Sequence, residues 1–283
     1  MNGFLLIDKP TGVTSFEVVK QLRKLTGEKS IGHAGTLDPL ATGLLVIALG
    51  EGTKLLEYFV GCDKEYEVVG HFGFSSDTYD ADGVISKVSG SVVAEEKIKE
   101  VVSTKFLGEI SQVPPKFSAL KIGGRKAYHL ARKGEDFELK SRTIRVGRFD
   151  VENFDWPRVA FKVACSTGTY IRSLIHDLGA ELGVGAYVEK LRRTRVGEFE
   201  VSESCPLDNK IEHFLLPLET VVKGFIAVEL SEIEYKKLKQ GQFLGIKVDQ
   251  MGPVMAFYQK KLVGVLEKTA TSLVKFRKQI SLS

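Results

Sequence analysis

The sequence has few cysteines and no long apolar run. Its three cysteines, Cys62, Cys165 and Cys205, stand far apart in 283 residues and form no CxxC pair. A disulfide framework is not indicated, and we expect a reduced, cytoplasmic protein. The longest apolar stretch, residues 44–49, is far below the ~20 residues of a membrane helix. The apolar start ends at the charge of Asp8, too early for a signal-peptide core.

Sequence patterns of the common metal and cofactor sites are also missing. The five histidines show no paired spacing with cysteines or acidic residues, which disfavours a zinc site. No P-loop and no GxGxxG motif introduces a helix, so no nucleotide cofactor is indicated. The acidic stretch 78–83 fails the calcium-loop pattern, because Thr78 and Ser89 stand where that loop carries Asp and Glu. We therefore expect neither a cofactor nor a bound metal.

The composition is that of a folded chain, with 43% hydrophobic and 27% charged residues. Its length allows one large domain or two unequal ones. The net charge is only +4, but residues 116–148 hold ten lysines and arginines against three acidic residues. Such a local basic field attracts a polyanion. A solvated lysine-rich face would give the same count, so the charge alone leaves both interpretations open.

Hydrophobic periodicity predicts a mixed α/β body. We expect a helix from Thr14, whose spacing to Glu17 forms a capping box, as far as Gly27. Further helices are predicted near 94–106 and 170–182, and strands at 3–8, 44–49, 64–74, 143–150 and 158–165. The stretch 107–142 is hard to place: Pro114-Pro115 interrupts it, and a basic helix is expected at 125–133. We expect it to be a mobile, basic surface segment.

The pattern changes after about residue 222. We predict a short helix opening at Ser231 and strands at 225–230, 246–248, 254–259, 262–266 and 273–277. Many short strands separated by glycine turns are typical of a small β-barrel appended to a larger body.

The most unusual segment is residues 32–43, Gly-His-Ala-Gly-Thr-Leu-Asp-Pro-Leu-Ala-Thr-Gly. Its glycines permit close approach of the backbone to a ligand, and Pro39 fixes the conformation beside Asp38. A carboxylate on a rigid loop at the head of a strand can act as nucleophile or general base. The alternative is an Asp-Pro turn in which Asp38 only caps the local backbone.

This segment resembles the catalytic motif of TruB-type pseudouridine synthases. Other segments resemble further motifs of that family in the same order, namely residues 3–10, 64–66, 76–83, 113–121, 165–174 and 191–194. The resemblance implies an α+β fold, with a mixed-sheet catalytic domain at 1–222 that includes a mobile RNA-binding thumb at 116–142. It also implies a small β-barrel, PUA-like RNA-binding domain at 223–283, on a shorter and less distinctive match.

The resemblance assigns catalytic roles to three residues. Asp38 would be the catalytic carboxylate, attacking the uracil ring or the ribose, or abstracting a sugar proton. Tyr66 would stack on the target uracil, although its pattern also suits an ordinary aromatic on a buried strand face. Arg172 would be the ion-pair partner of Asp38, whereas the residues alone leave an exposed helix arginine as the alternative.

A uridine in a folded RNA loop must leave the base stack before it can be reached. The resemblance implies that His33 fills the vacated space, although a lone histidine could equally bond the loop backbone. Asp80 would order the loop or contact RNA, and Tyr170 and Leu191 would line the pocket, unless they are core residues. The basic thumb residues implied in RNA binding are Lys121, Arg125 and Lys126.

The implied activity is isomerisation of uridine 55, in the T-loop of tRNA, to pseudouridine, without cofactor, metal or membrane, by a protein that we expect to be a monomer. One alternative is a non-catalytic RNA chaperone, which would not need Asp38, Tyr66 and Arg172 together. Another is a synthase of related fold that acts only with a guide RNA and accessory proteins. The absence of a long extension before residue 3 argues mildly against that alternative.

Overall fold

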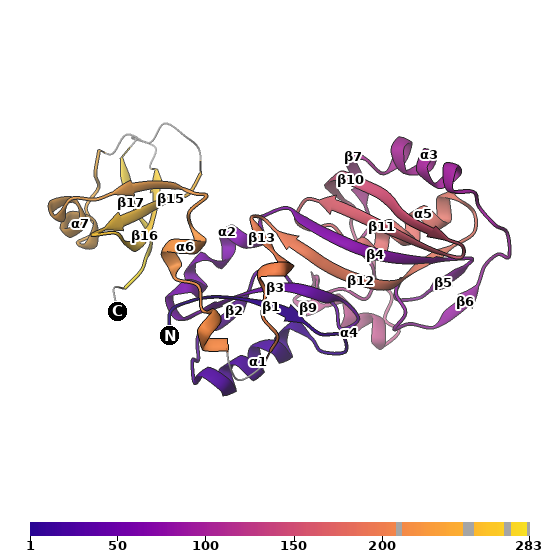
Figure 1. The fold of residues 1–283 in the computed structure, drawn as a ribbon, viewed down its shortest axis with the longest axis horizontal. Helices are drawn as coiled ribbons and strands as arrows, with labels where there is room; N and C mark the ends of the chain where they lie inside the picture. Colours follow the sequence, from indigo (N-terminus) through magenta and orange to yellow (C-terminus); the bar gives the residue numbers. More distant parts are fainter. Residues whose placement is uncertain (208–210, 246–251, 269–272, 282–283) are drawn as a thin grey trace.

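The computed structural model describes residues 1–207, 211–245, 252–268 and 273–281. A mixed sheet of nine described strands forms the body, and its main path runs β1-β3-β12-β4-β11-β10-β7, with β2 on β3 and β13 on β12 (Figure 1). Its strands are β1 (Gly3–Lys9), β2 (Ile31–His33), β3 (Thr42–Leu49), β4 (Lys64–Phe72), β7 (Gly108–Gln112), β10 (Arg142–Asp155), β11 (Arg158–Cys165), β12 (Ala186–Val196) and β13 (Phe199–Glu200). The mixed α+β fold expected from the sequence is confirmed.

The predicted helices of the body are present. They are α1 (Ser15–Thr26), α3 (Glu95–Lys105) and α5 (Ile171–Glu181), with a short α2 (Leu56–Val60) between β3 and β4. The capping box of α1 forms in both directions between Thr14 and Glu17, and the helix ends at Gly27, where φ is 69°. No described helix has the length and apolar character that crossing a membrane requires.

The main core lies between the sheet and the helices α1, α3 and α5. Apolar side chains of α3 and α5 such as Ile98, Leu174 and Ile175 are buried against Phe72 and Phe161 of the sheet. The alternating pattern of β4 ends at Gly73, whose φ is 86°. The predicted strand 64–74 is therefore divided, and residues 74–76 pair with 85–87 in a separate hairpin, β5 (Phe74–Ser76) and β6 (Ile85–Lys87).

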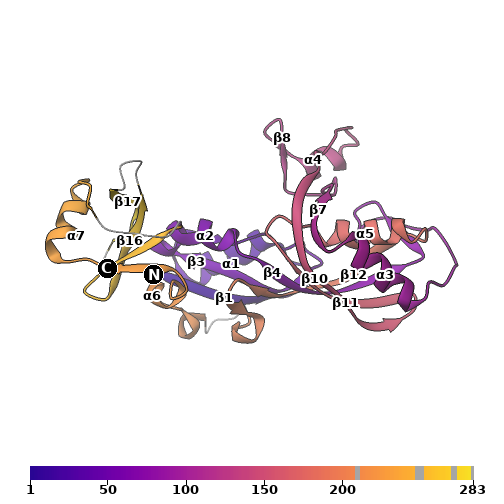
Figure 2. The same ribbon diagram turned by 90° about the horizontal axis from the view of Figure 1, so that it is seen from above.

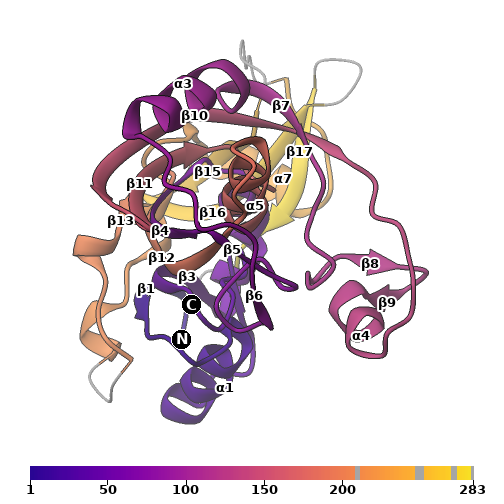
Figure 3. The same ribbon diagram turned by 90° about the vertical axis from the view of Figure 1, so that its right-hand side faces the viewer.

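The segment after α3 contains more regular structure than its sequence suggests. Residues 108–112 add β7 to the edge of the sheet beside β10, a strand that polar Gly-Glu-Ile-Ser-Gln did not indicate. The chain then leaves the sheet as β8 (Lys121–Ile122), β9 (Arg125–Lys126) and α4 (Ala127–Arg132). Figures 2 and 3 show these three elements projecting away from the body. The expected basic helix is thus shorter than residues 125–133.

The C-terminal residues form a separate four-stranded sheet in the order β14-β15-β16-β17 at the opposite end of the molecule from α3 (Figure 1). Its elements are β14 (Ile226–Glu229), α7 (Glu232–Lys239), β15 (Val254–Tyr258), β16 (Lys261–Lys268) and β17 (Val274–Gln279), preceded by α6 (Leu218–Val221). In the described part of the chain this sheet does not close into the predicted barrel. The strand expected at 246–248 lies outside the described residues.

One parallel contact in the body sets the position of the loop before β3. Thr42 and Gly43 pair with Arg192 and Arg193 of β12, and the residues of each pair are 150 positions apart in the chain. Gly43 has a φ of 97°, and a Cβ atom there would lie 2.3 Å from the carbonyl oxygen of Arg193. Only glycine fits this crossing of the two strands.

This close approach yields a stability prediction. Gly43→Ala should lower the free energy of unfolding by about 2 kcal/mol or more, because both the left-handed φ and the clash oppose a side chain. Gly61→Ala is the matched control, since its φ is −72° and no atom lies within 4 Å of an added Cβ. Urea denaturation of both variants checks this. Equal midpoints for the two would contradict the conclusion that only glycine fits at position 43.

Candidate active site

A buried arginine joins three segments at one end of α5. The side chain of Arg172 is only 4% exposed, and its Nε and Nη1 atoms lie 2.9 Å from Oδ2 of Asp38 and 3.3 Å from Oδ2 of Asp80. Nη1 also donates to the carbonyl of Thr78, and Nη2 donates to the carbonyl of Phe117. A buried guanidinium is tolerated only when its charge and its donors are matched. Arg172 therefore ties the loop of Asp38, the acidic turn and the base of the projecting segment together.

Hydrogen bonds from Ser15 and Lys9 also hold the backbone of the loop that carries Asp38. The Ser15 hydroxyl, at the start of α1, accepts from the Leu37 amide and donates to the Leu37 carbonyl, at 2.9 and 3.1 Å. The buried ammonium of Lys9 donates to three backbone carbonyls, including that of Pro39 at 3.4 Å. The Asp38 side chain itself remains 35% exposed. The backbone is fixed while the carboxylate stays accessible.

A second buried arginine lies on β12. Arg193 is 1% exposed and donates to the carbonyls of Leu44 and Gly35, at 2.8 and 3.1 Å. Among the described residues no carboxylate forms an ion pair with it. Its guanidinium interacts with the Tyr66 hydroxyl: burial raises the pKa of this phenol, and the cation opposes the rise. Arg193 thus places a positive charge beside the tyrosine.

Burial and neighbouring charges shift the pKa values of Asp38 and His33. Burial raises the pKa of the Asp38 carboxyl above its ordinary value, while the neighbouring Arg172 opposes the rise. Burial lowers the pKa of His33, and the charge of Arg193 lowers it further. At neutral pH His33 is therefore uncharged, whereas the ion pair with Arg172 favours an ionised Asp38.

The structure brings five of the predicted site residues into one cavity. A cavity of about 310 Å³ is lined by Asp38, Tyr66, Tyr170, Arg172 and Leu191 together with residues 166–169. The floor comes from β4 and β12, where Tyr66 and Leu191 point to the same face of the sheet. The guanidinium of Arg142 lies 4.6 Å from the centre of the Tyr170 ring. One acid, two aromatic rings and the guanidinium groups of Arg142, Arg172 and Arg193 thus converge on a space of nucleobase size.

Three further predicted residues line an adjoining cavity of about 590 Å³. His33, Asp80 and Lys126 lie there with Asp38 and Arg172, so the two cavities meet at the ion pair. The expectation that Arg172 could be a simple exposed helix arginine is wrong, because its side chain is buried.

Lys121 and Arg125 are not brought next to Asp38. They line a small basic hollow of about 400 Å³ with Lys126 on the projecting segment. Arg125 forms a bidentate ion pair with Glu135, with N–O distances of 2.6 and 2.9 Å. A role for these two residues therefore has to involve a ligand larger than the cavity at Asp38.

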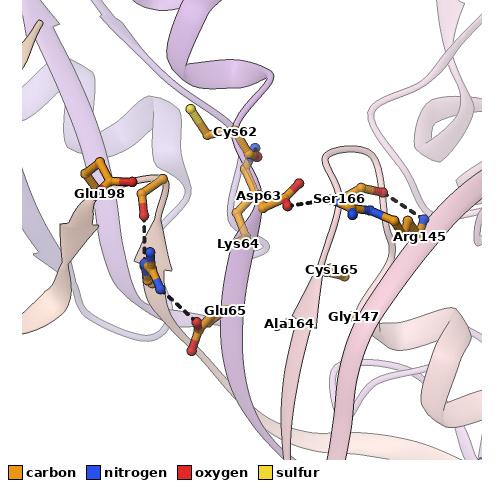
Figure 4. A pocket seen from close by; sticks show the side chains of 12 residues that line it. Cys62, Asp63, Lys64, Glu65, Arg145, Gly147, Ala164, Cys165, Ser166 and Glu198 are labelled. Atoms are coloured by element: carbon orange, nitrogen blue, oxygen red, sulfur yellow. Dashed lines mark hydrogen bonds and ion pairs between the residues drawn. The ribbon is translucent and has the colours of Figure 1, made fainter. Parts of the chain in front are cut away.

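A separate cavity of about 470 Å³ lies between β4, β10, β11 and β12. Its arginines already have carboxylate partners. Arg145 pairs with Asp63 (Figure 4), and Arg195 pairs with Glu65. In the described residues no group of His, Cys, Asp or Glu side chains is arranged to hold a metal ion. We therefore place the candidate site at Asp38 and not here.

Sequence reasoning missed Lys9, Ser15 and Arg193 as parts of the site. Arg193 did leave a signal, since it follows Leu191 by two positions and so falls on the buried face of an alternating strand. An arginine on an inward face marks either a functional charge or an unusual set of acceptors. Lys9 and Ser15 left no such signal, because their partners are backbone carbonyls and amides, which residues of any type supply.

Known proteins are similar to this chain in sequence and in fold. The model of the TruB family pseudouridylate synthase (N terminal domain) matches residues 23–171, and that of the tRNA pseudouridylate synthase B C-terminal domain matches 172–223. The chain is 38% identical over 279 residues to tRNA pseudouridine synthase B of Clostridium tetani, covering 95% of this chain and 96% of the relative. It is 40% identical over 276 residues to that of Aquifex aeolicus, covering 94% and 96%.

Solved structures agree with the sequence relationship. An H/ACA RNP bound to a substrate RNA containing 2′-deoxyuridine superimposes with a TM-score of 0.74 at 26% identity, covering 99% of this chain and 85% of that one. A Cbf5-Nop10-Gar1 complex gives 0.74 at 27% identity, covering 99% and 84%. With family models that span residues 23–223 and relatives matched over nearly their whole length, the chain belongs to the TruB family of pseudouridylate synthases.

Proposed function

We propose that this pseudouridine synthase isomerises uridine 55, in the T-loop of tRNA, with Asp38 as its catalytic carboxylate. The observation that carries the proposal is the ion-pair cluster in which Arg172 joins Asp38 and Asp80 at the wall of an accessible cavity. The tRNA substrate is supported by the relatives, which are named tRNA pseudouridine synthase B. The isolated chain can bind one tRNA as a monomer, without metal or cofactor.

The reaction explains why one carboxylate is sufficient. The bond between N1 of uracil and C1′ of ribose breaks, a bond from C5 to C1′ forms, and the proton on C5 is replaced by one on N1. No atom is gained or lost overall. An ionised Asp38 can begin this sequence by attack on the ring or the sugar, or by removing a sugar proton. Each route needs the carboxylate ionised and pointed into the cavity, which is what Arg172 provides.

The remaining cavity residues then bind the detached base. Tyr66 stacks on the uracil from the floor of the sheet and assists removal of the C5 proton, with Arg193 stabilising negative charge on its phenol. Tyr170 and Leu191 form the walls that hold the ring while it rotates. Asp80 holds Arg172 through Nη1, while Asp38 contacts Nε of the same guanidinium.

A uridine reaches this cavity only after flipping out of its stack. His33 lines the adjoining cavity, near the ion pair but outside the smaller space, and it is neutral at neutral pH. We propose that its ring occupies the position that the flipped base leaves. A neutral ring is suited to this role because it stacks against bases without requiring a counter-charge.

Residues 116–142 act as the RNA-binding thumb. In the described residues, side-chain hydrogen bonds from α5 reach the start of this segment: Arg172 donates to the carbonyl of Phe117, and Ser173 donates to that of Val113 just before it. Its tip carries Lys121, Arg125 and Lys126 around one basic hollow. Phosphate contacts from this tip would draw it over the RNA loop.

The chain divides into a catalytic domain at 1–222 and a PUA-like RNA-binding domain at 223–283. The C-terminal strands have their own core, which includes Leu230, Leu238 and Val263. A shared apolar core joins them to the body, in which Met255 and Val265 pack with Phe4 and Leu55, and surface pairs such as Arg277 with Glu57 add to this contact. A small β-barrel in this region would extend the RNA-binding surface along the stem of the tRNA arm.

Loss of the carboxylate should abolish the reaction. The substrate is unmodified tRNA that carries tritium at C5 of its uridines. The protein alone should release tritium from it, and Asp38→Asn should release it at least about 10⁴-fold more slowly. RNA binding by the variant should persist, because the side chain grips no phosphate. Activity in the absence of guide RNA or accessory proteins also separates this function from the guide-dependent alternative. Tight binding without release by the unmodified protein would support the chaperone alternative.

The pKa of Asp38 gives a pH dependence with a defined sign. A carboxyl with a raised pKa gains its proton as the pH falls through a value above that of an ordinary aspartate, so single-turnover rates should decline there. Arg172→Gln removes the charge that favours the ionised form and should move this decline to higher pH. Arg172→Lys keeps the charge and should move it less. Identical acid limbs in all three proteins would rule out Asp38 as the group that titrates.

Hydrogen exchange tests the thumb. Amides of residues 116–142 should exchange rapidly in the free protein and become protected on addition of a T-arm hairpin, while those of β11 stay protected throughout. Protection of the thumb equal to that of β11 before RNA is added would show that it is already rigid.

A further inference from the structure

An aromatic side chain stands exposed at the mouth of the larger cavity. Phe16 is 55% exposed, although it lies in a helix whose neighbouring Ser15, Val18 and Val19 are buried. It lines the cavity of about 590 Å³ that also contains Asp38. A single exposed aromatic is not unusual on a protein surface, but its position beside the proposed catalytic carboxylate gives it access to the same ligand.

The orientation of Phe16 is fixed by the start of α1. The capping box between Thr14 and Glu17 encloses this residue, so its backbone is helical and rigid. One turn along the helix, the Lys20 ammonium lies 5.0 Å from the centre of the Phe16 ring. Lys24 follows at the same spacing and is also exposed. Residues 16, 20 and 24 therefore form a strip on one helix face, with the aromatic ring nearest the cavity and cations beyond it.

The projecting segment presents the same combination from another wall of this cavity. Tyr128 lies between two cations, with Lys126 Nζ at 5.6 Å and the Arg132 guanidinium at 5.9 Å from its ring centre. All three line the cavity together with Phe16. Two aromatic rings, each accompanied by positive charge, thus border the entrance to Asp38 from α1 and from α4.

We infer that the strip Phe16–Lys20–Lys24 of α1 is a binding site for unpaired RNA next to the target uridine. One base stacks on the Phe16 ring, and the following phosphates lie against Lys20 and Lys24. Aromatic faces accept any base, while lysines on the same face match the backbone charge. This inference rests on the proposed function, since it concerns the same RNA, and it adds α1 as a second contact surface besides the thumb.

The stacking contact is tested with Phe16→Ala, Phe16→Trp and the control Phe214→Ala. Phe214 is 47% exposed and lines none of the cavities near Asp38. For a T-arm hairpin we expect Phe16→Ala to raise Kd and KM about 5- to 100-fold, the range for loss of one stacked base. Phe16→Trp should bind within about 3-fold of the unaltered protein, since its larger ring also stacks. Equal Kd values for Phe16→Ala and Phe214→Ala would overturn the inference.

A direct signal comes from 2-aminopurine placed in turn at each unpaired position of the hairpin. One position should be quenched by the unaltered protein and by Phe16→Trp, but not by Phe16→Ala. If, at every labelled position, Phe16→Ala quenches 2-aminopurine as strongly as the unaltered protein does, no base stacks on Phe16. Because these are binding measurements, they separate this inference from the proposed function, which is tested by tritium release from the unaltered protein and from Asp38→Asn.

The lysines are tested by the salt dependence of binding. Lys20→Ala with Lys24→Ala should reduce the slope of log Kd against log salt concentration by about 1 to 2, through loss of one or two phosphate contacts. The control is Lys97→Ala with Lys99→Ala, on the exposed face of α3. A slope unchanged in the α1 variant, or reduced equally in the control, would contradict a phosphate track along α1.

Discussion

The site depends on the burial of one guanidinium. Removing an arginine from water is costly unless its charge and its donors find partners, and Arg172 finds two carboxylates and two carbonyls. These partners come from three segments that are far apart in sequence. Because the same cation satisfies all of them, the loop of Asp38, the acidic turn and the base of the thumb keep a fixed relation. The geometry of the proposed catalytic group is thus a consequence of satisfying a buried charge.

The sheet supplies the second constraint. The parallel contact of Gly43 with Arg193 brings the end of the Asp38 loop against β12, and the side chain of Arg193 then bonds the loop carbonyls. Tyr66 reaches the cavity from the neighbouring strand, β4. The floor is therefore rigid, while the thumb above it is joined to the body mainly at its base. A rigid floor beneath the proposed mobile thumb suits a uridine that has to flip out of its base stack before it reacts.

Much of the body could be predicted from the sequence, because its elements carry strong local signals. The alternation in β11, the stripe of α5 and the capping box at Thr14 each identify an element without tertiary information. The family motifs placed Asp38, Tyr66 and Arg172 in one site. The strand β7 escaped prediction because a polar edge strand owes its pairing to β10 and not to its own pattern. Lys9 escaped because its partners are backbone carbonyls, which leave no trace in a sequence, and the signal of Arg193 was confined to its position on the buried face of β12.

The central claim is that Arg172 and Asp80 act as one unit in holding Asp38. A double-mutant cycle of single-turnover pseudouridine formation tests it most directly, with Arg172→Lys, Asp80→Asn and the combined variant at saturating RNA. If Arg172 and Asp80 act together, either change alone disorders the ion pair between Arg172 and Asp38. The double variant should then react little more slowly than the slower single variant. If the rate reduction in the double variant equals the product of the two single reductions, the residues act independently and do not hold Asp38 jointly.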